Sequence, residues 1–231
     1  MRRPIYMDHH ATTPVLPEVL EAMAPYFSER FGNPSSTTHV FGKEGADAVE
    51  AARRSVALLA GARPSEVVFT SGATESINLA IRGAIAAAGG RGRIVTSAIE
   101  HEAVLETCRA LESTGCELEV LGVDPSGLVD PAQVERALER PAALVSIQVA
   151  NNEIGTIEPV AEIARITRSR GVLLHADAAQ AAGRIPIDAG SLGADLLSFS
   201  SHEMYGPKGA GALYVRRGVR IVAQQTGGGH E

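Results

Sequence analysis

The sequence contains no tryptophan, two cysteines and only 4% aromatic residues in 231 positions. Cys108 and Cys116 are eight residues apart, which matches neither a metal-binding pattern nor a disulfide framework, so we expect two reduced structural thiols. There is no run of about 18 apolar residues that could span a bilayer. A formal net charge of −6 leaves no basic field for a nucleic-acid backbone. The sequence therefore predicts a protein with neither membrane nor nucleic acid as its partner.

The N-terminus also lacks the apolar core of a signal peptide, because two arginines are followed closely by Asp8, His9 and His10. We therefore expect a cytoplasmic protein. Its 45% hydrophobic and 21% charged residues are enough to build a globular fold with a full core.

Helical and strand patterns alternate along the chain. Helical spacing of apolar residues occurs at 17–31, 42–59 and 77–88, and around 104–111, 134–138 and 163–166. Short apolar runs predict strands at 67–70, 93–97, 117–122, 142–149, 172–176, 196–199 and 211–215. Runs without polar alternation are typical of strands covered on both faces. The pattern predicts one α/β domain with a mainly parallel sheet flanked by helices, whose last strand is antiparallel to its neighbour.

Polar residues follow directly after several of these strands, where ligands bind in open α/β sheets. Residues 71–74, which include Ala73 and Thr74, lie at a helix start, where free backbone N–H groups and a hydroxyl could seat a phosphate. The alternative is an ordinary helix N-cap. His101 follows the next strand and could stack on a flat ring or shuttle protons, or could be structural.

Two further strand ends carry amides and an acid. Of the adjacent Asn151 and Asn152, one is expected to cap the turn and the other to bind a ligand. Asp177, with Gln180 three residues on, would be costly in an apolar setting unless it held a cation such as a protonated ring nitrogen. The alternative is a solvated loop aspartate.

The segment 198–209 is a polar turn between two apolar runs, and it includes Ser200, His202 and Glu203. Gly206 and Pro207 prevent it from continuing as a buried strand, so we expect a loop that presents chemistry. Together, the phosphate seat, the stackable histidine, the acid and this loop suit one ligand, pyridoxal 5′-phosphate.

The same motifs support a family resemblance. They are 8–15 (DHHATTPV), 31–35 (FGNPS), 69–76 (FTSGATES), 100–101 (EH), 151–155 (NNEIG), 175–180 (HADAAQ), 198–202 (SFSSH), 205–209 (YGPKG) and 227–231 (GGGHE). In this order they resemble the cysteine desulfurases of the NifS and IscS type, in the class V aminotransferase branch of fold-type I enzymes. The resemblance implies that residues 1–231 form a single pyridoxal-phosphate-binding large domain, with segment 1–15 packing toward a small domain that this chain lacks.

The resemblance also implies roles for individual residues. Ala73, Thr74, Ser200 and His202 would hold the phosphate, and His101 would stack on the pyridine ring and assist proton transfer. Asp177 would pair with the ring nitrogen, Gln180 would bond the phenolic oxygen, and Asn152 would orient the substrate. The implied reaction takes sulfur from L-cysteine as an enzyme persulfide and leaves L-alanine, for iron–sulfur cluster or thio-cofactor assembly.

One residue departs from the family pattern. The lysine that links covalently to the cofactor would follow Ser-Ser-His, and Glu203 is at that position. A carboxylate cannot form an imine. Its negative charge would also repel the anionic phosphate of the cofactor, because two unit charges about 4 Å apart repel by about 4 kcal/mol at an effective dielectric near 20. Lys208 belongs to the Gly-Pro-Lys-Gly turn and is not a substitute. We therefore expect no covalent attachment of the cofactor.

The resemblance further implies a homodimer that delivers sulfur to an acceptor or scaffold protein. The small domain would carry the sulfur-accepting cysteine, so neither Cys108 nor Cys116 is assigned persulfide chemistry. Two hypotheses follow. The first is a cysteine desulfurase large domain, inactive as it stands. The second is a non-catalytic protein of the same descent that acts as a scaffold or binds the cofactor, including pyridoxamine phosphate, whose ammonium could pair with Glu203.

Overall fold

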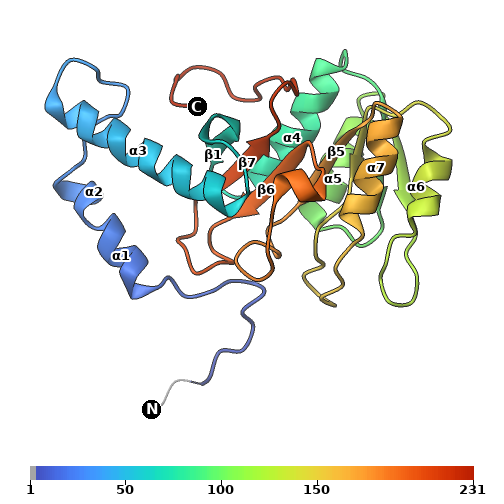
Figure 1. Cartoon of the computed structure of the whole chain (residues 1–231), viewed down its shortest axis with the longest axis horizontal. Coiled ribbons are helices and arrows are strands. Elements are labelled where there is room, and N and C mark those ends of the chain that lie inside the picture. Colours follow the sequence, from blue (N-terminus) through green and yellow to red (C-terminus); the bar gives the residue numbers. More distant parts are fainter. Residues whose placement is uncertain (1–3) are drawn as a thin grey trace.

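A seven-stranded sheet forms the centre of the computed structural model, which describes residues 4–231 (Figure 1). The strands are β1 Val67–Thr70, β2 Arg93–Ser97, β3 Glu117–Leu121, β4 Leu144–Ser146, β5 Leu173–Asp177, β6 Leu196–Ser200 and β7 Gly211–Val215. Their spatial order is β1-β7-β6-β5-β4-β2-β3. Only β7 runs antiparallel to its two neighbours, so the carboxyl ends of the other six strands lie at one edge of the sheet.

Helices cover both faces of this sheet. They are α1 Pro17–Met23, α2 Pro25–Ser28, α3 Val40–Leu59, α4 Ala73–Ala87, α5 Glu102–Glu112, α6 Pro131–Ala137, α7 Val160–Ser169 and α8 Ala189–Leu192, with a 3-10 turn at Pro64–Glu66. Alternate strand residues point to opposite faces. Ile94 packs with α4 and α5, whereas its neighbour Val95 packs with α6, α7 and the end of α3. The two resulting cores make a three-layer α/β/α arrangement.

The expected helices and strands are confirmed with three main differences in their bounds, and α8 was not predicted. The expected helix 17–31 is divided into α1 and α2, because Pro25 begins a new helix. The helix expected from residue 77 begins earlier, at Ala73. Its N-cap residue is Gly72, and no side chain caps its first turn. The regular part of β4 is short, yet the N–H groups of Ile147 and Val149 still donate to β5 carbonyls.

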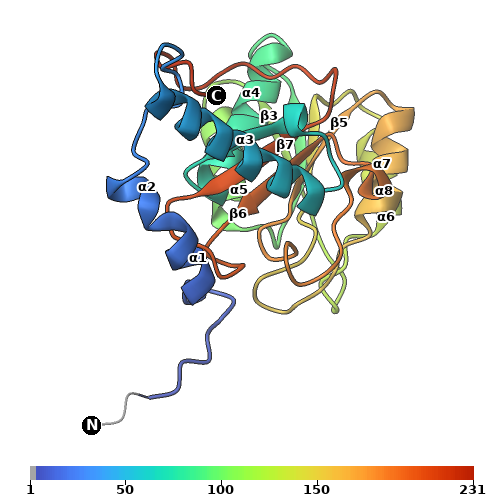
Figure 2. The same ribbon diagram turned by 60° about the vertical axis from the view of Figure 1, so that its left-hand side comes forward.

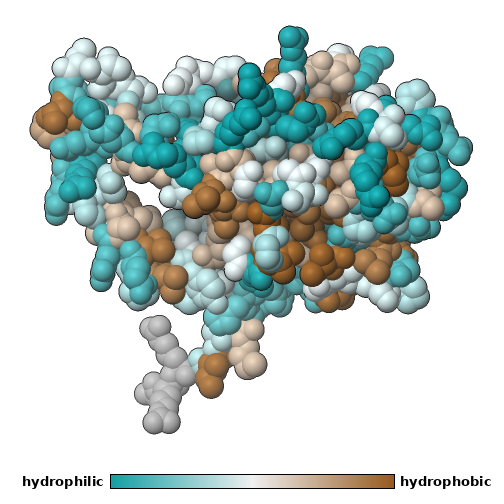
Figure 3. All heavy atoms as spheres, in the orientation of Figure 1, coloured by the Kyte–Doolittle hydropathy of each residue, from teal (hydrophilic) through white to brown (hydrophobic). Residues whose placement is uncertain are grey.

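Helices α1 and α2 form an arm that stands away from the sheet alongside α3 (Figures 1 and 2). This arm and the start of α3 expose large apolar side chains, among them Leu20, Phe27, Phe31, Val40 and Phe41. Some of this hydrophobic surface is visible on the left of Figure 3. No helix within residues 4–231 is both long and apolar enough to cross a membrane.

Both cysteines are buried and free, as the sequence predicts for structural thiols. Cys108 lies on α5 and Cys116 just before β3. Burial raises the pKa of the Cys108 thiol to about 12, so this sulfur remains protonated near neutral pH.

Candidate active site

Every candidate residue from the sequence follows, or lies at, the carboxyl end of one of the six parallel strands. Ala73 and Thr74 follow β1, His101 follows β2 and Asn152 follows β4. Asp177 ends β5, with Gln180 after it, and Ser200 ends β6, with His202 and Glu203 after it. The sheet therefore places five loops at one edge, which is where open α/β folds bind ligands.

The β1–α4 turn lies directly against the end of β6. Thr70, Gly211 and Ser200 form one row across β1, β7 and β6. A Cβ atom on Gly211 would lie 2.5 Å from the Cα of Gly72, so only glycine allows this approach. The close approach places the first turn of α4, with Ala73 and Thr74, beside Ser200. No side chain caps this helix, so the ordinary N-cap interpretation is wrong, and the free N–H groups of the first turn suit an anion.

The hydroxyl of Ser200 is buried without a hydrogen-bond partner among the described residues. The residue is 1% exposed. A buried hydroxyl without a partner is costly, and a phosphate oxygen would satisfy it. His202, two residues on, is half-buried, and its Nδ1 lies 3.2 Å from Thr12 Oγ1. Ser200, His202 and the start of α4 thus fit a phosphate ester.

His101 forms the N-cap of α5 and is exposed. Its Nδ1 accepts a hydrogen bond from the Ala103 N–H at 3.0 Å, which leaves Nε2 protonated in the neutral ring. The structural interpretation of this histidine is therefore correct, and the exposed ring also remains available to a ligand.

Asp177 is 8% exposed, so it is not the solvated loop aspartate that the sequence allowed as an alternative. Burial raises the pKa of its carboxyl to about 6, with the charge of Glu203 acting in the same direction. The Ala179 N–H, which donates to Oδ1 at 3.0 Å, and the charge of His101 lower it. His101 and Glu203 therefore both act electrostatically on Asp177. A buried acid near such a pKa is suited to a protonated ring nitrogen.

One of the two amides after β4 closes the turn, as the sequence predicts, and ligand binding by the other stays a prediction. Asn151 is buried, and its Oδ1 accepts the N–H groups of Glu153 and Ile154, which closes the turn. Asn152 is half-buried, and the only side-chain hydrogen bond it makes among the residues described is from Nδ2 to the Glu153 carboxylate at 2.8 Å. Asn152 is thus the amide that a substrate could recruit.

Glu203 lies in the loop after β6, and its side chain is 13% exposed. Its Oε2 is buried without a hydrogen-bond partner in the described part of the chain. Gln180 Nε2 lies 3.5 Å from Oε1 but donates more closely, at 2.8 Å, to the His10 carbonyl. Glu203 itself has no amine with which to form an imine, and the absence of a covalent link stays a prediction.

The N-terminal segment holds this loop in place, a contact that the sequence did not reveal. Thr13 Oγ1 donates to the His202 carbonyl at 2.7 Å and accepts the Tyr205 N–H at 2.8 Å. Tyr205 has φ +63, the only left-handed backbone among non-glycine residues 4–231, and the Leu16 N–H binds its carbonyl. Residues 13–16 therefore stabilise a strained conformation next to Glu203. Packing of segment 1–15 on a small domain stays a prediction, and residues 1–3 lie outside the described residues.

A second group of polar residues that the sequence did not reveal is buried within the sheet. His175 Nδ1 lies 2.8 Å from Ser146 Oγ, and its Nε2 lies 2.8 Å from Ser198 Oγ, which links β4, β5 and β6. Burial lowers the pKa of His175 to about 3, so the imidazole is neutral. Ser146 is in register with His175, whereas Ser198 lies opposite Asp177, two residues beyond the partner of His175, so aligned strands could have indicated only the Ser146–His175 pair.

Glu100 fixes the turn that carries His101. Its Oε1 accepts from Ser97 Oγ at 2.7 Å and from the Gln148 N–H at 3.0 Å, whereas Oε2 has no hydrogen-bond partner in the described structure. Burial raises its pKa to about 8, which keeps the carboxyl protonated at neutral pH.

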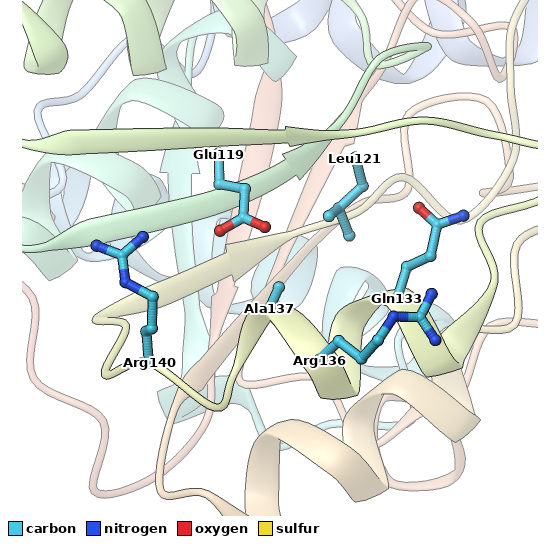
Figure 4. Close-up of a pocket in the computed structure, with 6 residues that line it drawn as sticks. All are labelled: Glu119, Leu121, Gln133, Arg136, Ala137 and Arg140. Atoms are coloured by element: carbon cyan, nitrogen blue, oxygen red, sulfur yellow. The ribbon is translucent and has the colours of Figure 1, made fainter.

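One surface hollow lies away from these loops, between β3 and α6. It has a volume of about 380 Å³ and is lined by Glu119, Leu121, Gln133, Arg136, Ala137 and Arg140. Figure 4 shows Glu119 and Leu121 pointing from β3 toward Ala137 on α6. Arg140 forms a bidentate ion pair with Glu117, and Arg93 pairs with Glu119. These pairs neutralise much of the local charge, so the hollow offers no site comparable to the strand-end loops. No cluster of metal-ligating side chains occurs within residues 4–231.

Comparison with known proteins identifies the family of the chain. Residues 5–231 match the family model described as aminotransferase class-V. The chain is 55% identical to a cysteine desulfurase IscS of Anaeromyxobacter sp. (strain Fw109-5) and 54% identical to one of Pseudomonas aeruginosa, and in each case all of the chain covers 58% of the relative. The chain thus spans less than two thirds of the length of these curated relatives.

Solved structures give the same result. A structure titled SspA in complex with cysteine has a TM-score of 0.94 and 42% identity, over 98% of this chain and 66% of that one. A NifS-like protein has a TM-score of 0.95 and 41% identity, over 99% of this chain and 63% of that one. The expected fold, that of the fold-type I large domain, is confirmed. The chain therefore belongs to the class V aminotransferase family.

Proposed function

We propose that this chain is the cofactor-binding large domain of a pyridoxal-phosphate-dependent cysteine desulfurase whose substrate is L-cysteine. The observation that carries the proposal is the buried, unpartnered Ser200 Oγ beside the start of α4. An anion-binding helix start and an orphaned hydroxyl at one sheet edge fit a phosphate ester, and the names of the relatives supply the reaction.

In the proposed site the protein supplies binding, orientation and protonation. Ala73, Thr74, Ser200 and His202 hold the phosphate, and Asp177 holds a protonated ring nitrogen. Gln180 reaches the phenolic oxygen by giving up its bond to the His10 carbonyl.

His101 covers the ring face and moves protons through Nε2, because Nδ1 is engaged at the start of α5. Asn152 orients the substrate. The cofactor, when bound, supplies an electron sink for the cleavage of bonds at the amino acid.

The unusual residue is Glu203. Without an amine at this position we expect no covalent attachment of the aldehyde and no desulfuration by this chain. The chain therefore binds the cofactor and shares the descent of the cysteine desulfurases, but it does not catalyse the reaction while Glu203 is present. Transfer of sulfur to an acceptor or scaffold protein, assembly as a homodimer and a cytoplasmic location belong to the same proposal.

Substitution of Glu203 tests this assignment. The Glu203→Lys chain, mixed with pyridoxal phosphate and treated with borohydride, is expected to yield a covalent adduct that peptide mapping places at position 203. The unsubstituted chain is expected to show no adduct there, and Glu203→Lys with Ser200→Ala is expected to need more cofactor for the same yield. Absence of an adduct at position 203 in a folded Glu203→Lys chain would contradict the proposed site.

Addition of L-cysteine tests the substrate. A change in the visible absorbance of the loaded Glu203→Lys chain is expected with L-cysteine and not with D-cysteine. Equal responses to the two enantiomers would remove the support for L-cysteine while leaving the cofactor assignment intact.

A further inference from the structure

The carboxylate of Glu203 lacks a partner of its own. Its Oε2 is buried and has no hydrogen bond within residues 4–231, and Oε1 has only long contacts, to Gln180 Nε2 at 3.5 Å and to His202 Nε2 at 3.9 Å. Arg184 is nearby, but its Nη2 donates to the backbone carbonyls of His9 and Glu203 rather than to the carboxylate. A buried carboxylate oxygen without a donor is costly, so this position calls for one.

A second acid increases the demand for positive charge. The charge of Glu203 acts on Asp177, which ends the neighbouring strand β5 and is itself buried. The whole chain has two lysines, Lys43 and Lys208. Lys43 pairs with Asp47 on α3, and Lys208 is exposed and forms no ion pair in the described part of the chain. No lysine is therefore available to neutralise Glu203.

Resting on the proposed function, we propose that the pocket selects the amine form of its cofactor, a phosphorylated pyridine with a protonated aminomethyl group, over the aldehyde form. This ligand is pyridoxamine 5′-phosphate. Its phosphate suits Ser200 and the start of α4, its ring nitrogen suits Asp177, and its ammonium donates to the free oxygen of Glu203.

The aldehyde form fits the same pocket less well. A carbonyl oxygen is an acceptor only, so against Glu203 it would face another acceptor and leave Oε2 unpartnered. The ammonium has three donors and a full charge, and hydrogen bonds between charged groups are about twice as strong as neutral ones. We expect the amine form to bind about ten- to hundredfold more tightly than the aldehyde form.

Calorimetric titration at pH 7.5 measures this preference directly. The ligands are pyridoxamine phosphate, pyridoxal phosphate, unphosphorylated pyridoxamine and inorganic phosphate. The unsubstituted chain is expected to bind pyridoxamine phosphate at least about tenfold more tightly than pyridoxal phosphate. Glu203→Gln, which is nearly isosteric, is expected to bring the ratio close to one. Circular dichroism and thermal unfolding check that the variant folds.

Glu203→Lys is the matched opposite. It is expected to reverse the preference, because its amine condenses with the aldehyde with loss of one water and repels the ammonium of the amine form. Lys208→Ala in the same background separates a link at position 203 from one at the only other nearby lysine. Equal or tighter binding of the aldehyde form by the unsubstituted chain overturns the inference, as does an unchanged ratio in Glu203→Gln.

The outcomes also distinguish this inference from the proposed function. If Glu203→Lys forms the covalent adduct but the unsubstituted chain shows no preference for the amine, only the inference fails. If no phosphorylated pyridine binds to any folded variant, the proposed cofactor site fails and the inference fails with it.

Discussion

Ser198 and Ser200 are two residues apart on the same face of β6, yet their hydroxyl groups differ in hydrogen bonding. Ser198 Oγ is hydrogen-bonded to His175, whereas Ser200 Oγ has no partner within the described residues. The same contrast occurs on β5, where His175 is fully bonded and Asp177 accepts a single N–H.

The contrast distinguishes buried polar groups that have partners within the protein from those that we propose to bind the cofactor. Inside the sheet, the protein satisfies its own buried polar atoms. At the strand ends, Ser200 Oγ, Glu203 Oε2 and Glu100 Oε2 are left without donors or acceptors. Unpartnered buried groups cost stability, and three of the five found within residues 4–231 follow or end these strands. The other two are Glu158 Oε1 and His9 Nδ1, so an unpartnered atom supports a site only together with its neighbours.

The largest expected effect comes from breaking the satisfied set. His175→Ala removes a buried ring and leaves the hydroxyls of Ser146 and Ser198 without their partner, so we expect a loss of about 3–5 kcal/mol in the free energy of unfolding. Urea denaturation measures it. His10→Ala, which removes an exposed ring, is the control and is expected to change stability little. A loss below 1 kcal/mol for His175→Ala would show that the buried chain is not structural.

Glu100→Gln tests a carboxyl that has one satisfied and one unsatisfied oxygen. Its pKa rises from 4.5 to about 8 on folding, so its contribution to stability is present below pH 4.5 and is lost as pH rises toward 8. At pH 8 the variant is expected to be about 4 kcal/mol more stable than the unsubstituted chain, and at pH 4.5 nearly equal. Urea denaturation at both pH values gives the difference. Parallel pH profiles would contradict the buried, protonated state.

Asp177→Asn applies the same reasoning to the proposed ring-nitrogen partner. The pKa of Asp177 rises from 3.8 to about 6, so the stability it contributes below pH 3.8 is lost as pH rises through 6. We expect the variant to gain about 3 kcal/mol at pH 8 and nothing near pH 4. The gain in stability should be accompanied by weaker binding of pyridoxamine phosphate, measured by calorimetry. A variant that binds this ligand unchanged would remove Asp177 from the site.

The smallest effects come from the matched serines. Ser198→Ala leaves His175 Nε2 without a partner and is expected to cost about 1–3 kcal/mol, whereas Ser200→Ala removes an orphaned hydroxyl and is expected to change stability by less than about 0.5 kcal/mol. Only Ser200→Ala is expected to weaken binding of phosphorylated ligands. If both variants behave alike in both measurements, the division between the two serines is wrong.

The sequence predicts the sheet well because buried parallel strands have unbroken runs of apolar residues. It also predicts which loops carry the site, because polar residues directly follow those runs. Pro25 indicates a break in the helix expected at 17–31, but the helical spacing of the apolar residues continues across it, so one helix was predicted instead of two.

The partnership of individual polar atoms could not be predicted. Ser198 and Ser200 look alike in the sequence, and only the position of His175 on the next strand distinguishes them. Likewise, no local pattern links Thr13 to Tyr205, since the contact depends on the completed sheet. The roles of the individual site residues stay predictions until ligand binding is measured.

The clamp between Thr13 and the loop after β6 has a consequence for how the molecule is made. The two segments are 189 residues apart, so a growing chain must hold its first residues unengaged until β6 and its loop have been synthesised. Closing so long a loop costs entropy that is recovered only after the intervening sheet has formed. We therefore expect the strained turn at Tyr205 to form late in folding. The loop that carries Glu203 is held in place only when Thr13 has met it.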